Sequence, residues 1–263
     1  MGVRYVLSLP EAYDRRKKLK EQFDLLGLNF EIIEAKRISE KEIMELEKKR
    51  ERGGGKIGIG AIGCFCSHIE AWRKISENSE RGGFVFEDDA KFSSSAYNFI
   101  CDDEWIPECV DVCQLSYWPS KKHPKGKIFR VLRKKEIGGE DRVHKLIHIF
   151  SPCPWGTQGY WISKRAAERA LKMVDYYFKE PVDSFLFSRD SKFWKRSQVY
   201  SLTPAVVTEF LEGTSMRIAI DSATETVLGK DVNADLKRSK NLCGRLSDKF
   251  ICLFCDKQYH GFE

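Results

Sequence analysis

The chain has 263 residues, enough for one large domain or two small ones with a full hydrophobic core. Its hydrophobic content of 42% is typical of a globular protein and excludes a disordered one. No stretch reaches the roughly 18 to 20 apolar residues that a membrane span needs, and the apolar start is too short for a secretory signal. We therefore expect a cytoplasmic protein that can also act at the inner face of the membrane.

The formal net charge of +6 is concentrated in one segment. Residues 121–135 hold eight lysines and arginines and no acid, so the rest of the chain sums to −2. A basic segment of this density attracts phosphate groups, whether on lipids, on an anionic acceptor or on nucleic acid.

Nine cysteines with irregular spacing are typical of free thiols in a reducing compartment. A zinc site at Cys252 and Cys255, with Cys243 before them and His260 after them, stays open as the alternative.

The N-terminal third has the pattern of a parallel strand–helix–strand unit. Residues 3–9 form an apolar run, residues 14–26 have helical spacing closed by Gly27, and residues 30–35 form a second apolar run. Ser39 and Glu42 then form a capping box for a charged helix that we expect to reach Arg52.

A glycine-rich segment follows at residues 53–63, which we expect to be a loop before a helix at residues 65–75. It contains Gly58-Ile-Gly60-Ala-Ile-Gly63, which has the spacing of the dinucleotide-binding fingerprint. That fingerprint must directly follow a buried strand, whereas a charged helix and three glycines precede this one. We therefore reject a dinucleotide site.

The acidic run Glu87-Asp88-Asp89 follows a short apolar strand expected at residues 83–86. Adjacent carboxylates repel one another unless a cation or hydrogen-bond donors hold them. Acidic clusters are also common on protein surfaces, but ligands of open α/β sheets bind at the carboxyl ends of strands. A divalent ion held there would stabilise the charge that develops on a departing diphosphate. We assign Asp89 to the metal, with Glu87 as the second candidate ligand, and Glu87 or Asp88 to the ribose or the sugar.

The second half of the chain alternates further strands and helices. We expect a β-hairpin at residues 127–132 and 143–150, a loop at 151–159, a strand at 160–162, a helix at 163–177, a helix at 184–189 and the last sheet strand at 199–207. We expect a domain of residues 1–222 and a C-terminal extension of residues 223–263, whose amphipathic part packs on the domain or lies on a membrane.

Several of these blocks together resemble glycosyltransferase family 25, the bacterial lipooligosaccharide glycosyltransferases to which collagen galactosyltransferases are similar. The blocks are Val6-Leu-Ser-Leu9 with Arg15-Arg16, Gly60-Ala-Ile-Gly-Cys-Phe-Cys-Ser-His68 with Trp72, Val85-Phe-Glu-Asp-Asp89, Gly156-Thr157 with Tyr160-Trp161-Ile162-Ser163, and Pro181-Val182-Asp183 with Pro204. They cover roughly residues 3–210. Ala61 and Cys66 depart from the family pattern, which commonly has Glu and Leu there.

The resemblance implies an α/β fold of the GT-A type, a single domain with a Rossmann-like mixed sheet flanked by helices. It also implies Mn²⁺ or Mg²⁺ and an inverting transfer of galactose from UDP-galactose to a saccharide or glycolipid acceptor in lipopolysaccharide or lipooligosaccharide synthesis. The donor-binding residues it implies are Ser8, Leu9, Arg15, Arg16, Glu87, Asp88, His68, Gly156 and Thr157. The metal ligands are Asp89 and Glu87, and the general base is Asp183.

Each of these roles has a simpler alternative. His68 and Trp72 share a helix face, where they either face a ligand or pack against the sheet. Arg15 and Arg16 either hold the diphosphate or are solvated, and Gly156-Thr157 is either a sugar contact or a plain turn. Asp183 either accepts a proton or caps the following helix.

Two other functions compete with glycosyl transfer. A metal-dependent nucleotidyltransferase or phosphohydrolase also uses acidic strand ends, but it needs further carboxylates and histidines nearby. A membrane- or nucleic-acid-binding module would use the basic segment, although it leaves the acidic run unexplained and no nucleic-acid motif is visible, so we expect no nucleic-acid partner.

Overall fold

The structure, a computed structural model, describes residues 2–35, 38–39, 41, 57–116, 126–135, 141–149, 156–174 and 180–209. Of the expected helix from Ser39 to Arg52, only Ser39 and Lys41 are described, and the C-terminal extension with Cys252 and Cys255 lies outside the described residues. In the described part of the chain, no helix is both long and apolar enough to cross a membrane.

The N-terminal unit folds as expected. Strand β1 (Val3–Ser8) is followed by helix α1 (Tyr13–Leu26) and strand β2 (Glu31–Glu34), and β1 and β2 pair in parallel. Gly27 ends α1 with a φ of 64°, a left-handed conformation that glycine adopts without steric cost.

The glycine-rich segment is not a loop throughout. Helix α3 (Ile59–Asn78) begins inside it and ends just before strand β3 (Gly82–Glu87). Gly60 and Gly63 therefore lie in the first turns of a helix, a position that their low helix propensity disfavours and that we did not predict. The two described residues just before this helix, Ile57 and Gly58, lie outside any strand.

The remaining elements of the described chain follow in order. They are β4 (Ala90–Phe92), α4 (Tyr97–Ile100), β5 (Val112–Gln114), β6 (Gly126–Lys135), β7 (Asp141–Ile149), β8 (Gly159–Ser163), α5 (Lys164–Val174), α6 (Val182–Phe187), the 3-10 helix η1 (Trp194–Arg196), β9 (Val199–Thr203) and β10 (Val207–Glu209). The predicted hairpin is confirmed, because β6 and β7 pair antiparallel.

Eight strands form one mixed sheet in the order β2-β1-β3-β8-β5-β9-β7-β6. The expected last strand at residues 199–207 is two strands, because β9 ends before Pro204 and β10 pairs with β4 in a separate two-stranded sheet. Proline has no N–H to donate to a ladder, so a continuous strand through Pro204 is unfavourable.

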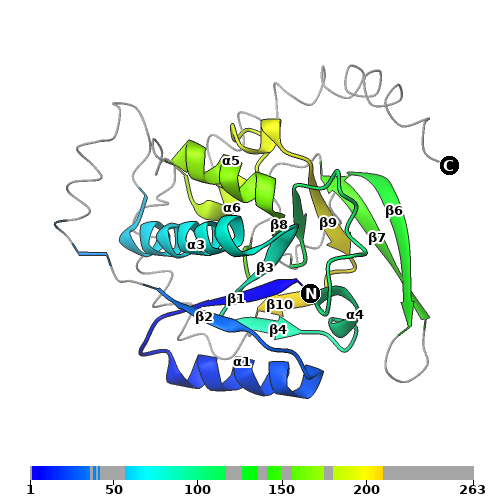
Figure 1. Cartoon of the computed structure of the whole chain (residues 1–263), viewed down its shortest axis with the longest axis horizontal. Helices are drawn as coiled ribbons and strands as arrows, with labels where there is room; N and C mark the ends of the chain where they lie inside the picture. Colours follow the sequence, from blue (N-terminus) through cyan, green and yellow to red (C-terminus); the bar gives the residue numbers. More distant parts are fainter. Residues whose placement is uncertain are drawn as a thin grey trace, which may run out of the picture.

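Hydrophobic clusters cover the two faces of the sheet, with α3, α5 and α6 on one side and α1 and the β4–β10 pair on the other (Figure 1). On the first side, Ala166, Ala167 and Ala170 of α5 are fully buried, and their small side chains allow the helix to lie close to α3. On the second side, Leu19 and Phe23 of α1 are fully buried. The predicted α/β class, with a mixed sheet flanked by helices, is confirmed.

Candidate active site

The site lies at the end of the sheet where β1 and β3 have their carboxyl ends, and we call this the site edge of the sheet. Because β1 and β3 are parallel, Ser8 and Glu87 both lie at this edge. Strand β8 runs antiparallel to β3 and pairs Gly159 with Phe86, so its amino end and the preceding Thr157 are at the same edge. The short strand β5 ends there as well, with Gln114 opposite Tyr160.

Asp88 forms a polar cluster with the end of β1 and the start of α1. Its carboxylate accepts a hydrogen bond of 2.7 Å from Ser8 Oγ and forms an ion pair of 3.1 Å with Arg15. Arg16 donates to Ser8 Oγ at 2.9 Å and to the Ser8 carbonyl at 3.0 Å. Burial raises the pKa of the Asp88 carboxyl, and Ser8 and Arg15 only partly oppose this effect. Ser8, Arg15, Arg16 and Asp88 are thus brought together as predicted.

Glu87, the last residue of β3, points to the other side of the strand. Its Oε1 accepts hydrogen bonds from Thr157 Oγ1 and from His68 Nε2, the latter at 3.3 Å. Burial raises the pKa of the Glu87 carboxyl, but the hydrogen bonds from His68 and Thr157, together with the charge of Arg15, outweigh it, so the pKa lies below its ordinary value. Glu87 is therefore held as a carboxylate.

His68 is fully buried and faces Glu87 rather than solvent. Its Nδ1 lies 2.8 Å from the Tyr160 hydroxyl, which also accepts a hydrogen bond of 2.9 Å from Trp72 Nε1. The sequence did not identify Tyr160 as part of a polar network, because an aromatic residue in an apolar strand is usually core. The Tyr160 ring packs in the hydrophobic core, and its hydroxyl is part of the polar network.

Asp183 lies in the first turn of α6 rather than at its cap. The helix begins at Val182, and Asp183 Oδ1 accepts a hydrogen bond of 2.7 Å from the N–H of the next residue, Ser184. Burial raises the pKa of the Asp183 carboxyl to about 6, with a further contribution from the charge of Glu87. Asp183 therefore lies close enough to Glu87 and His68 to interact with them electrostatically.

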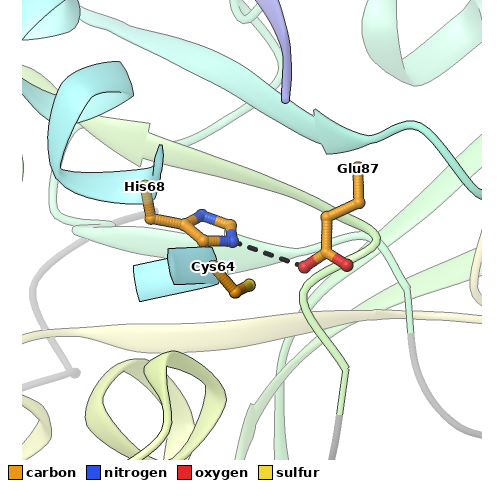
Figure 2. Close-up of side chains that lie close together, drawn as sticks. All are labelled: Cys64, His68 and Glu87. Carbon is orange, nitrogen blue, oxygen red and sulfur yellow. Dashed lines mark hydrogen bonds and ion pairs between the residues drawn. The ribbon is translucent and has the colours of Figure 1, made fainter. Parts of the chain in front are cut away.

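Cys64, His68 and Glu87 could hold a metal ion, because one ligand atom from each lies within 4.8 Å of the others (Figure 2). Cys64 and His68 are one helical turn apart on α3, and Glu87 reaches them from β3. Burial raises the pKa of the Cys64 thiol well above its usual value, and the neighbouring carboxylates raise it further. A thiol, unlike a thiolate, is a poor metal ligand, so this set needs the ion itself to displace the proton.

A family model decides the relationship of the chain. The model for glycosyltransferase family 25, described as an LPS biosynthesis protein family, matches residues 1–186. The chain belongs to glycosyltransferase family 25. The predicted resemblance is thereby confirmed over the part of the chain that carries β1, α3, β3, β8 and most of α6.

Three family 25 relatives illustrate the similarity. The lipooligosaccharide biosynthesis protein lic2B of Haemophilus influenzae is 33% identical over 110 residues, which are 41% of each chain. The lacto-N-neotetraose biosynthesis glycosyltransferase LgtE of Neisseria meningitidis is 24% identical over 241 residues, 90% of this chain and 82% of the relative. Procollagen galactosyltransferase 1-A of Xenopus laevis is 29% identical over 195 residues, 69% of this chain and 30% of the relative. This chain thus spans less than half the length of two of these relatives.

Two further family 25 blocks lie beside the site. Gly156, with a φ of 111°, adopts a backbone conformation that favours glycine, and its carbonyl accepts a hydrogen bond of 3.0 Å from Gln114. Gln114 is in turn held by Ser201 at 2.8 Å, a contact between β5 and β9 that no sequence motif indicated. Leu9 follows β1, and its carbonyl accepts a hydrogen bond from Ser8 Oγ at 3.3 Å.

The family 25 departures at Ala61 and Cys66 both lie on α3, where each side chain is half-buried. The side chains of the basic segment 121–135 lie outside the described residues, although the backbone of β6 is described.

Proposed function

We propose that the chain transfers a hexose from a UDP-sugar to a saccharide acceptor in lipopolysaccharide or lipooligosaccharide synthesis, with inversion at the anomeric carbon. UDP-galactose is the first donor to test. One observation carries the proposal: the sheet edge joins a cluster of arginine, serine and aspartate at the end of β1 to a pair of carboxylates, Glu87 and Asp183, in different electrostatic environments. Family membership supports the same reaction class.

The cluster at the end of β1 suits the nucleotide. Arg15 and Arg16 are half-buried, and both are oriented by the contacts with Asp88 and Ser8 described above. Two positive charges fixed in this way would stabilise the negative charge that builds up on a departing diphosphate. Asp88 then acts by orienting Arg15, because its carboxylate is already engaged by Ser8 and Arg15.

The carboxylate oxygens of the acidic run fit a hard divalent ion. Thr157 and His68 both bind Oε1 of Glu87, and Oε2 is the other oxygen of that carboxylate. Asp89 supplies a second carboxylate in the turn after β3. Carboxylate oxygens are the donors that Mn²⁺ and Mg²⁺ prefer, so Asp89 and Glu87 would hold the ion. Such an ion neutralises charge on the diphosphate.

Asp183 suits the acceptor side. An inverting transfer needs a base that removes the proton from the attacking hydroxyl. A carboxylate with a pKa of about 6 is ionised at neutral pH, yet is more basic than an ordinary aspartate. We propose that the reaction takes place in the cytoplasm, at the inner face of the membrane where a glycolipid acceptor is exposed.

Transfer assays with the purified chain test the proposal. UDP-galactose, UDP-glucose and UDP-N-acetylated hexoses are compared by UDP release, with and without Mn²⁺, and the anomeric configuration of the product is read by NMR. Thermal shifts with UDP, ATP and oligonucleotides run in parallel, because a ligand that binds the native state raises the melting temperature. Stabilisation by UDP and by one UDP-sugar supports the proposal. Stabilisation by ATP alone, with phosphate release, would instead support a nucleotidyltransferase or phosphohydrolase.

A further inference from the structure

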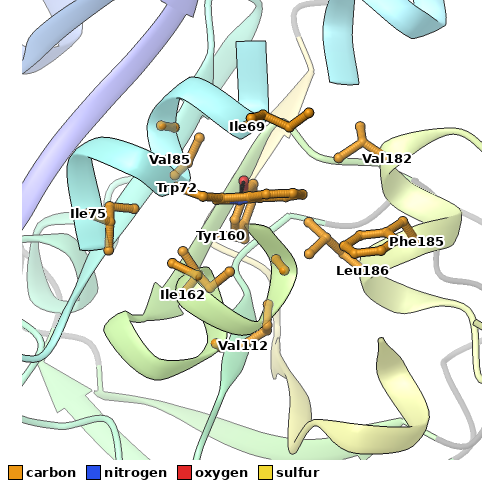
Figure 3. Close-up of a cluster of buried hydrophobic side chains, with 14 of the residues drawn as sticks. Ile69, Trp72, Ile75, Val85, Val112, Tyr160, Ile162, Val182, Phe185 and Leu186 are labelled. Atoms are coloured by element: carbon orange, nitrogen blue, oxygen red, sulfur yellow. Dashed lines mark hydrogen bonds between the residues drawn. The ribbon is translucent and has the colours of Figure 1, made fainter. Parts of the chain in front are cut away.

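The Tyr160 hydroxyl lies inside the apolar core between the sheet and helices α3 and α6. The Tyr160 side chain is fully buried among Ile69, Trp72, Phe185 and other apolar residues (Figure 3). In the described part of the chain this hydroxyl has two partners, Trp72 Nε1 at 2.9 Å and His68 Nδ1 at 2.8 Å. A buried hydroxyl is costly unless it is hydrogen-bonded, so these two contacts must satisfy it.

The chemistry of the partners fixes the direction of both hydrogen bonds. The indole nitrogen of Trp72 can only donate, so the Tyr160 oxygen accepts from it. The hydroxyl proton then has one acceptor among the described residues, Nδ1 of His68. Burial raises the pKa of the phenol well above its usual value, so this proton stays on Tyr160.

The direction continues through the imidazole. If Nδ1 accepts, the proton of the neutral ring is on Nε2, which faces Oε1 of Glu87 at 3.3 Å. Glu87 accepts it as a carboxylate. The Trp72 indole, the Tyr160 hydroxyl and the His68 imidazole thus form a directed relay that ends on Glu87, and the relay runs from α3 through β8 to β3.

Two other proton arrangements place a proton on Nδ1, so that Nδ1 cannot accept from the Tyr160 hydroxyl. One is an imidazolium ring, which is protonated on both nitrogens. The other involves a metal ion. His68 could bind a metal ion through Nε2, together with Cys64 and Glu87. The ring proton would then be on Nδ1 and would point at the Tyr160 oxygen. The Tyr160 hydroxyl proton would have no acceptor among the described residues, inside a fully buried cluster. Leaving a buried donor unsatisfied costs its full desolvation, so the hydrogen bonds favour the relay over the metal.

We propose that His68, Tyr160 and Trp72 are positioning residues that act through Glu87, by fixing a donor on its Oε1 and so holding the carboxylate in one orientation. The proposal rests on the proposed function only for its kinetic consequences. Thr157 donates to the same Oε1 and completes the arrangement. The proton on His68 Nε2 is a property of the protein alone and is measurable without substrate.

The first experiment reads that proton directly. Long-range ¹⁵N–¹H spectra of wild-type protein without substrate distinguish a ring protonated at Nε2 from one protonated at Nδ1. We expect the Nε2–H form for His68 in the wild type. In Tyr160→Phe, which removes the hydroxyl that donates to Nδ1, we expect that His68 is no longer held in this one form. Tyr5→Phe, a buried strand tyrosine away from the site, is the control and leaves the His68 signals in place. An Nδ1–H ring in the wild type overturns the proposal, whether or not the protein transfers sugar.

The second experiment uses two substitutions of His68. The amide nitrogen of glutamine can occupy the place of Nε2 and donate to Glu87, whereas asparagine reaches only the place of Nδ1. We expect His68→Asn to lose about 10- to 100-fold in kcat, the range for a lost hydrogen bond to a charged group, with little change in KM for the acceptor. His68→Gln should keep kcat within about 3-fold of the wild type.

The comparison of the two variants separates this role from a merely structural one, because rescue by glutamine requires a donor at the place of Nε2. Equal losses of kcat in both variants contradict the relay. One equivalent of zinc in the purified wild type, lost in Cys64→Ser but retained in Cys66→Ser, would show that Nε2 is a ligand and would also overturn it.

Discussion

At the scale of residues, the site separates two carboxylates by their surroundings. Glu87 receives donors from His68 and Thr157, which keep its pKa below the ordinary value despite burial. Asp183 is half-buried and accepts a hydrogen bond from the Ser184 N–H, and burial together with the charge of Glu87 raises its pKa to about 6. Two carboxylates whose environments push their pKa values apart are suited to different tasks. The lower one stays charged, and the higher one can exchange a proton near neutrality.

The role of Asp183 as a base predicts a large effect of Asp183→Asn. An amide cannot accept the proton, so turnover should fall by roughly 10²- to 10⁴-fold while UDP binding, measured by calorimetry, stays unchanged. In the wild type, kcat should rise with pH with a midpoint near the pKa of about 6 and then stay level. Glu180→Gln, three residues earlier, is the control and should keep this turnover. Retained turnover in Asp183→Asn would leave Asp183 with a structural role in α6.

The ionisation of Asp183 also predicts the direction in which Asp183→Asn changes the stability of the fold. The pKa of Asp183 is about 6 in the folded protein and about 4 in an unfolded chain, so the folded state binds the proton more tightly. The contribution of Asp183 to the free energy of unfolding therefore decreases as pH rises from about 4 to about 6. Asparagine has no such ionisation, so Asp183→Asn should be at least as stable as the wild type at pH 8. A melting temperature well below that of the wild type at pH 8 would contradict this.

Asp89 has a different expected signature. If its carboxylate binds the donor-associated ion, Asp89→Ala should reduce transfer by on the order of 10²-fold or more with the fold intact by circular dichroism. EDTA should abolish wild-type transfer, and Mn²⁺ should restore it. Asp14→Ala on the exposed start of α1 is the control and should have no effect. Full activity after EDTA treatment would exclude the metal role.

At the scale of elements, the sequence predicted the helices and strands whose positions depend on residues close together in the chain. The β1–α1–β2 unit follows from an apolar run, helical spacing and Gly27. The start of α3 at Ile59 did not follow, because glycine has low intrinsic helix propensity and packing of the later turns against β1 and β3 decides the outcome. The division between β9 and β10 depends on pairing with β4, which is more than 100 residues away and leaves no local pattern.

The basic segment 121–135, which includes strand β6 of the hairpin, leads to a prediction about lipid binding. Strand β6 is at the edge of the sheet, where lysines also prevent pairing with another chain. If the basic segment instead binds anionic lipid, replacing Lys121, Lys122, Lys125 and Lys127 with glutamine should weaken sedimentation with anionic liposomes. Each lysine near such a surface contributes up to about 1 kcal/mol, and the effect should be largest at low salt.

The matched control removes the same charge elsewhere. Lys17, Lys18, Lys172 and Lys192 are exposed on the described surface, and their replacement with glutamine should leave liposome binding nearly unchanged. If both variants lose binding equally, only the net charge matters. If the wild type binds equally well at low and high salt, the basic segment has no electrostatic partner of this kind.

At the scale of the whole molecule, the sequence predicted which residues form the site better than how they contact one another. Family blocks selected Ser8, Arg15, Glu87 and Asp183, which the sheet brings to one edge. The engagement of Asp88 by Arg15 and the link from Trp72 to Glu87 depend on packing between α3, β8 and β3. Such contacts between distant segments have no signature in spacing or composition. The polar role of Tyr160 therefore required the structure.

The distribution of the core predicts that residues 1–222 fold without the C-terminal extension. Among the described residues, which end at Glu209, the two hydrophobic clusters are assembled from positions between Val3 and Val207, and the eight strands of the main sheet precede Pro204. Deleting residues 223–263 should shift the melting temperature by only a few degrees, since about 1 kcal/mol corresponds to roughly 2–4 °C in a domain of this size. UDP binding should be retained. A chain ending at residue 198 is the matched control, because it lacks β9 from the middle of the sheet and should not fold. Unfolding of the 1–222 chain, measured by circular dichroism, would show instead that the extension is an integral part of the domain.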